Sequence, residues 1–156
     1  MATIQPPSLP YQASGTSFVV SRRLMVATTY ETPIAFFRAI SKTICWSVRN
    51  TFCWANDHAL VLSAYADPTV SDSGQAQTPI NLRVGSQTKA TALVSGDPVV
   101  TDFGAYLASL KTAMAPATSG LLMLIDPGHS LLVTATASTD QTDVGVGFSW
   151  YEVDLN

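Results

Sequence analysis

The sequence predicts an all-β protein, an antiparallel β-sandwich of jelly-roll type with one short helix. First, about eight short segments alternate apolar with polar residues, which is the period of a half-buried strand. Second, clusters of Gly, Pro, Asn, Asp and Ser separate these segments. Third, only 12% of the 156 residues are charged, whereas ordinary domains carry about 25%. Such a chain is neither a coiled coil nor a charged disordered tail.

Residues 1–16 are expected to form an extended arm outside the sheets. The segment contains Pro6, Pro7 and Pro10, which remove amide donors and fix the backbone angle φ. It is either a tail or an arm that lies across a neighbouring subunit. Three apolar side chains that could dock on a neighbour favour the arm: Ile4, Leu9 and Tyr11. Residues 17–156 are then expected to form the β-sandwich domain.

Strands are predicted at residues 18–20 and 22–30, and in much of 34–54, where the apolar residues alternate with polar ones. This last stretch holds two Cys-Trp pairs, Cys45-Trp46 and Cys53-Trp54. A turn between them, at residues 49–51, would place the pairs on neighbouring strands. The two thiols are then either small core residues or a hairpin disulfide.

The middle of the chain mixes loops, short strands and one helical pattern. Residues 60–66 form a predicted strand and 67–79 a loop; 80–84 and 89–94 are short strands with turns at 85–86 and 95–98. Thr101 and Asp102 could cap a helix over residues 103–114, because Phe103, Tyr106, Leu107 and Leu110 have helical spacing. We expect this helix, at about 102–114, to pack against the core.

The last third of the chain gives the clearest strand pattern. Strands are predicted at residues 121–125, 130–137 and 144–155. Asp126-Pro127-Gly128 has the composition of a turn, and residues 138–143 form a polar loop.

No set of residues indicates catalysis, a cofactor or a metal. The chain has only two histidines, His58 and His129, and none of the common nucleophile, zinc or phosphate-loop motifs. Glu31 and Glu152 are far apart, and nothing marks them as a catalytic pair. Four loop aspartates could form thin calcium sites, but turn formation explains them better: Asp67, Asp72, Asp140 and Asp143. We therefore predict a protein that is not an enzyme.

The three tryptophans leave two interpretations open. Carbohydrate binding uses exposed aromatic rings, and a β-domain of this size also needs large aromatic residues in its core. The sequence does not decide between these roles for Trp46, Trp54 and Trp150.

Charge and hydropathy limit the partners and the place of synthesis. A net charge of −3 with only one adjacent basic pair, Arg22-Arg23, argues against strong binding of nucleic acid. No apolar run is long enough for a membrane span, and residues 1–15 lack the features of a signal peptide. We expect synthesis in a cytoplasm. So few charges can cover little surface, which favours burial against other subunits over a monomer coated with Ser and Thr.

Three segments resemble small all-β structural proteins of tailed bacteriophages, of the head-decoration, head-fibre and tail-attachment types. They are LIDPGHSLLVTATAS, the terminal VGVGFSWYEVDL and the earlier FFRAISKTICWSVRN. The resemblance spans residues 24–155, although the two Cys-Trp pairs and the helical segment depart from it. It implies a non-enzymatic virion protein without catalytic residues.

Our leading expectation is thus a subunit that forms homo-oligomers and contacts other virion proteins, as capsid decoration, minor capsid or head-to-tail component. One alternative is a tail or fibre module that binds a glycan receptor. Another is the major coat protein of a small virus. In the leading case the protein resides in the virion after synthesis in the host cytoplasm.

Overall fold

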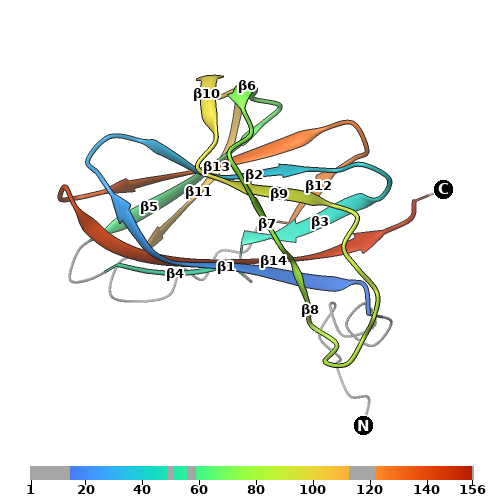
Figure 1. Ribbon diagram of the computed structural model, residues 1–156. Coiled ribbons are helices and arrows are strands. Elements are labelled where there is room, and N and C mark those ends of the chain that lie inside the picture. Colours follow the sequence, from blue (N-terminus) through green and yellow to red (C-terminus); the bar gives the residue numbers. More distant parts are fainter. Residues whose placement is uncertain (1–14, 49–50, 56–58, 113–121, 156) are drawn as a thin grey trace, which may run out of the picture.

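The computed structural model describes residues 15–48, 51–55, 59–112 and 122–155, which form two packed antiparallel sheets (Figure 1). Sheet A contains, in spatial order, β12 (Leu122–Ile125), β3 (Thr43–Ser47), β14 (Thr142–Val153), β1 (Ser17–Ala27) and β8 (Ile80–Asn81), with β4 (Phe52–Ala55) also paired to β14. Sheet B contains β11 (Ala105–Thr112), β5 (Leu60–Ala66), β13 (Ser130–Ala137), β2 (Thr32–Arg38), β9 (Leu93–Gly96) and β7 (Gln75–Gln77). The predicted antiparallel β-sandwich is confirmed.

A third element, the ribbon, consists of β6 (Thr69–Asp72) paired with β10 (Val99–Asp102). It rises from the outer side of sheet B in Figure 1. Leu132 of β13 faces away from the main core, yet it is fully buried, as its neighbour Phe36 nearly is. Part of the outer face of sheet B is therefore covered.

The main core lies between the two sheets and is rich in aromatic rings. The ring of Phe37 from sheet B meets those of Phe148 and Trp150 from sheet A edge-on, at centroid distances of 5.4 and 5.7 Å. It also stacks against Trp46, at 6.3 Å. Such edge-to-face pairs add to the gain from burial, and truncating one core ring to alanine typically costs about 3–5 kcal/mol.

The pairing of the main strands is nested. The eight main strands, in chain order, are β1, β2, β3 with its continuation β4, β5, β11, β12, β13 and β14. The first pairs with the eighth, the second with the seventh, the third with the sixth and the fourth with the fifth, always antiparallel. This is the pairing of one long hairpin that has been folded into two layers. Residues 67–104 are an insertion at its tip.

The two Cys-Trp pairs do not lie on neighbouring strands, so the hairpin considered for them does not form. β3 and β4 both pair with β14, β3 at residues 150–153 and β4 at residues 144–147. They follow one another along the same side of β14. Between them the Thr51 amide donates to the Val48 carbonyl at 3.1 Å, and β4 runs in the same direction as β3.

The predicted helix at 102–114 is also wrong for its described residues, because 105–112 form β11. This strand pairs with β5 and thereby satisfies the backbone groups along that edge of sheet B. Asp102 caps no helix: its Oδ1 accepts the Gly104 amide at 2.9 Å and closes a local turn. Gly104 has φ +84°, and a Cβ there would overlap the Ala66 carbonyl, so only glycine allows this close approach.

Other elements match the expectations to different degrees. Strands 60–66 and 130–137 are confirmed with the same bounds, and Gly128 takes φ +89° in the predicted turn after β12. The loop predicted at 67–79 instead contains β6 and β7. The strand predicted at 89–94 begins only at Leu93 and extends to Gly96. It therefore includes residues 95 and 96, which were predicted as part of a turn at 95–98. The arm of residues 1–16 lies outside the described residues, except for Gly15 and Thr16.

Candidate interaction surfaces

The outer face of sheet A beside β12 is bordered at one end by the carboxylate of Asp126, which accepts the Thr43 hydroxyl at 2.9 Å, and is otherwise uncharged on β12, β3 and the adjoining part of β14. Leu122 and Leu124 alternate with the buried Met123 and Ile125, and they expose 52% and 59% of their area. The outward residues that follow across β3 and β14 are uncharged: Cys45, Ser47, Ser149 and Tyr151. We call these six residues the uncharged face. Large exposed apolar side chains gathered on one sheet are typical of contact surfaces.

β12 is also an edge strand. Within the described residues it pairs only with β3, and no described strand pairs with its other side. Natural edge strands are usually protected by Lys, Pro or a bulge, because their unpaired backbone groups recruit other strands. β12 has the sequence LMLI and carries none of these protections.

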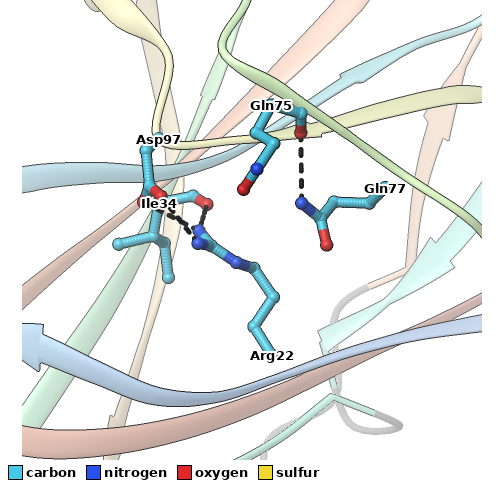
Figure 2. A network of polar contacts seen from close by, with 5 residues as sticks. All are labelled: Arg22, Ile34, Gln75, Gln77 and Asp97. Carbon is cyan, nitrogen blue, oxygen red and sulfur yellow. Dashed lines mark hydrogen bonds and ion pairs between the residues drawn. The ribbon is translucent and has the colours of Figure 1, made fainter.

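At the opposite edge of the sandwich, beside β8 and β9, an arginine links the two sheets. Arg22 of β1 reaches sheet B and donates to both carboxylate oxygens of Asp97, at 2.8 and 2.7 Å, and to the Ile34 carbonyl at 2.6 Å (Figure 2). Its guanidinium lies against Gly96, where a Cβ would come within 2.7 Å of the Arg22 Cζ. The contact with Arg22 holds the pKa of Asp97 below its ordinary value.

A buried carboxylate binds the backbone just before β9. Glu152 of β14 is only 3% exposed and accepts the amides of Thr91 and Ala92 at 2.9 Å, together with the Thr91 hydroxyl at 2.7 Å. The indole of Trp150 donates to it at 3.4 Å. Sheet A therefore holds the β9 segment at both ends, through Glu152 before the strand and Arg22 after it.

The outer face of sheet B presents a cluster of hydroxyl groups around a carboxylate. Glu31 Oε1 accepts the hydroxyls of Tyr65 and Thr134, both at 2.6 Å. Burial and this hydrogen bond to Glu31 raise the pKa of Tyr65 to about 12. Ser109 connects the neighbouring Tyr106 and Ser63 hydroxyls, each at 2.9 Å.

Of the two roles left open for the tryptophans, the core role holds for Trp46 and Trp150. Trp46 and Trp150 are 4% and 2% exposed and belong to the main core, so neither ring face is open to a sugar. Trp46 Nε1 is buried without a hydrogen-bond partner. The Trp54 side chain lies outside the described residues, as do the predicted docking residues Ile4, Leu9 and Tyr11.

The two cysteines are free in the structure. Burial raises the pKa of Cys53 to about 11, and burial together with the nearby Asp126 raises the pKa of Cys45. Both thiols are therefore protonated near neutral pH, which suits small packing residues and makes them poor nucleophiles.

The loop aspartates serve local turns and cross-links. Asp72 Oδ1 accepts the Gly74 amide at 2.9 Å, and Asp140 Oδ1 accepts the amide and hydroxyl of Thr29. Asp67 accepts the Ser130 amide at 3.0 Å and pairs with His129 at 2.9 Å. The described part of the chain holds no group of three or more metal-binding side chains. His58 lies outside it.

Sequence reasoning missed the residues that now stand out: Leu122, Leu124, Tyr106 and the clamps made by Arg22 and Glu152. The alternation within LMLI was a usable signal for the first two, because it leaves two leucines on the outward face. Nothing in the sequence pointed to the clamps, since Arg22 and Asp97 are 75 positions apart and Ala92 and Glu152 are 60.

Comparisons with protein-family models, curated proteins and solved structures find no match to this chain. No helix among the described residues has the length and apolar character of a membrane span.

Proposed function

We propose that the chain is a jelly-roll structural subunit of a virus particle, a non-enzymatic protein that assembles through protein–protein contacts. Its place would be that of a capsid decoration, minor capsid or head-to-tail component, made in the host cytoplasm. The nested pairing of eight strands supports the jelly-roll assignment, since a jelly roll is a long antiparallel hairpin rolled into two sheets. Jelly rolls are frequent in viral capsids. The resemblance to tailed-phage structural proteins points the same way.

The observation that carries assembly is the uncharged face with its open edge, β12. A second copy of this chain is the proposed occupant. Two β12 strands can pair antiparallel about a two-fold axis, which continues sheet A across the interface and buries Leu122 and Leu124 of both copies. A stable contact needs roughly 800 Å² from each partner, and the uncharged face beside the edge adds to what the strand itself buries.

The test is sedimentation of the purified chain and of a Leu122→Lys/Leu124→Lys variant. We expect an oligomer at micromolar concentration for the natural sequence. The variant should become a folded monomer, because two cations at the centre of the contact lose their hydration without gaining partners. Circular dichroism checks that the variant keeps its β structure.

The matched control is Val84→Lys/Val99→Lys, which adds the same charge at exposed valines away from β12: Val84 follows β8 at the opposite end of sheet A, and Val99 lies on β10. It should sediment like the natural chain. A monomeric natural chain, or an oligomer that survives both leucine substitutions, would contradict the proposed contact.

A second candidate is a coat protein that forms a closed shell by itself, and the jelly-roll pairing is the specific observation that favours it. Expression of the chain alone, followed by electron microscopy, separates the two functions. Closed particles support the coat protein; small discrete oligomers support the accessory subunit.

A further inference from the structure

We propose that the outer face of sheet B binds a neutral saccharide at the cluster of Glu31, Tyr65 and Tyr106. This site goes beyond the proposed assembly function, because it lies on the other sheet and uses different residues. Trp46 and Trp150 are excluded from sugar binding by their burial, whereas these tyrosines stand on an outer face.

The carboxylate of Glu31 is held in place through only one of its two oxygens. The hydroxyls of Tyr65 and Thr134 both donate to Oε1, and Oε2 accepts no hydrogen bond from the described residues. Thr134 is fully buried on the central strand β13, so Glu31 is anchored to a rigid part of the sheet. A fixed carboxylate oxygen with free lone pairs is a suitable acceptor for ligand hydroxyls, whose bonds to a charged group are the stronger kind.

Aromatic rings flank this carboxylate. The Tyr65 ring lies between those of Phe103 and Tyr106, at centroid distances of 5.3 and 5.7 Å with both pairs edge-on. Tyr106 is 60% exposed on the edge strand β11, although it is large and its hydroxyl is already bonded to Ser109. An amphipathic ring that is both fixed and exposed offers a flat surface for the apolar C–H face of a sugar.

The exposed hydroxyl of Ser109 adds a polar group beside the rings. Ser109 lies in one row with Ser63 and Thr134 across β11, β5 and β13; these two are buried, and the Ser63 hydroxyl holds that of Ser109 at 2.9 Å. Hydroxyls both donate and accept, and so they match the hydroxyl groups of a sugar without a net charge.

The charge of the site selects against anions. Glu31 takes part in no ion pair within the described chain, so its negative charge is not neutralised by a neighbouring cation. A phosphate or an acidic sugar would be repelled, whereas a neutral sugar avoids the cost of burying a like charge. A cationic peptide is the competing ligand, and its binding would weaken steeply with salt.

The experiment measures binding of glucose, galactose, mannose, N-acetylglucosamine and their disaccharides by saturation-transfer NMR and calorimetry. We expect at least one to bind in the millimolar range or tighter, with affinity insensitive to salt. Tyr106→Ala and Glu31→Gln should each weaken it about tenfold, equivalent to one lost stacking or charged contact. Sialic acid should bind more weakly than the neutral sugars.

Phe52→Ala is the matched control, because it removes a comparably exposed aromatic ring from β4 of sheet A. It should leave sugar binding unchanged. The proposal is overturned if no neutral sugar binds, if Tyr106→Ala binds as well as the natural chain, or if only an arginine-rich peptide binds. Repeating the measurement on the Leu122→Lys/Leu124→Lys variant separates the two proposals, since a sugar site within one subunit should survive the loss of assembly.

Discussion

The two edges of the sandwich are built in opposite ways. At the edge formed by β7, β8 and β9, the chain of the insertion passes from sheet B to sheet A (Figure 1), and Arg22 and Glu152 fix it from inside. At the edge formed by β11 and β12, no described residue provides a comparable charged link between the sheets. That edge instead exposes Leu107, Leu122 and Leu124.

The difference shows where a chain with few charges places them. Arg22 and Glu152 lie largely inside the molecule, where their hydrogen bonds fix one arrangement of β9. A charge used in this way cannot protect an edge strand from pairing with another chain. Because the chain has few charges and uses two of them inside the molecule, none is left on β12 to prevent strand pairing. We therefore expect a neighbouring subunit to bind at this edge.

Glu152→Ala should have the largest effect on the closed edge. The substitution leaves the amides of Thr91 and Ala92 without their acceptor, and the Ala92 amide is buried. Each unsatisfied buried donor costs about 1–3 kcal/mol, so we expect a loss of about 3 kcal/mol in the free energy of unfolding. Urea denaturation followed by tryptophan fluorescence measures it.

Asp143→Asn serves as the control, because it neutralises an exposed carboxylate at the start of the same strand, β14. Its effect should stay within about 0.5 kcal/mol, as is usual for surface substitutions. Equal effects of the two substitutions would show that Glu152 does not hold the edge.

The ion pair between Arg22 and Asp97 should contribute less. Its geometry is bidentate, but water screens the mostly exposed Asp97 carboxylate, and such pairs contribute about 1 kcal/mol or less. A double-mutant cycle with Arg22→Met and Asp97→Asn should return a coupling of that size. Because the pKa of Asp97 is lowered, its contribution is present above pH 3.8 and disappears as the pH falls through the folded-state pKa. Additive single effects would contradict the clamp.

The sequence predicted the fold class and the strands whose pattern is local. Ser130–Ala137 and Leu60–Ala66 lie in the middle of sheet B, where every second residue packs into the main core and gives the strand its period of two. Residues 105–112 were wrongly predicted as a helix because their apolar positions fit a helix as well as a strand. The free edge of β5, which settled the choice, is a tertiary feature that no local pattern contains.

The candidate surfaces were less predictable than the fold. A tryptophan in a β-domain can serve the core or a ligand, and only the pairing register shows that Trp46 and Trp150 face inward. The cluster on sheet B joins Glu31 to Tyr65, 34 positions later in the sequence, and to Thr134, 103 positions later. Such groups become neighbours only through the nested pairing of β2, β13 and β5.

The smallest effect is expected at the pair of His129 and Asp67, which joins the end of β5 to the start of β13 in full contact with water. Hydrogen bonding to Asp67 raises the pKa of His129 above 6.5, and the bond to His129 lowers the pKa of Asp67 below 3.8. The histidine's contribution is complete below pH 6.5 and is lost as the pH rises through its raised pKa. The aspartate's contribution is present above pH 3.8 and is lost on further acidification. In the Asp67→Asn variant, NMR titration should show the His129 pKa lowered toward its ordinary value, and thermal unfolding should show an almost unchanged melting temperature. A clear loss of stability would show that exposed charges matter to this fold as much as the buried clamps do.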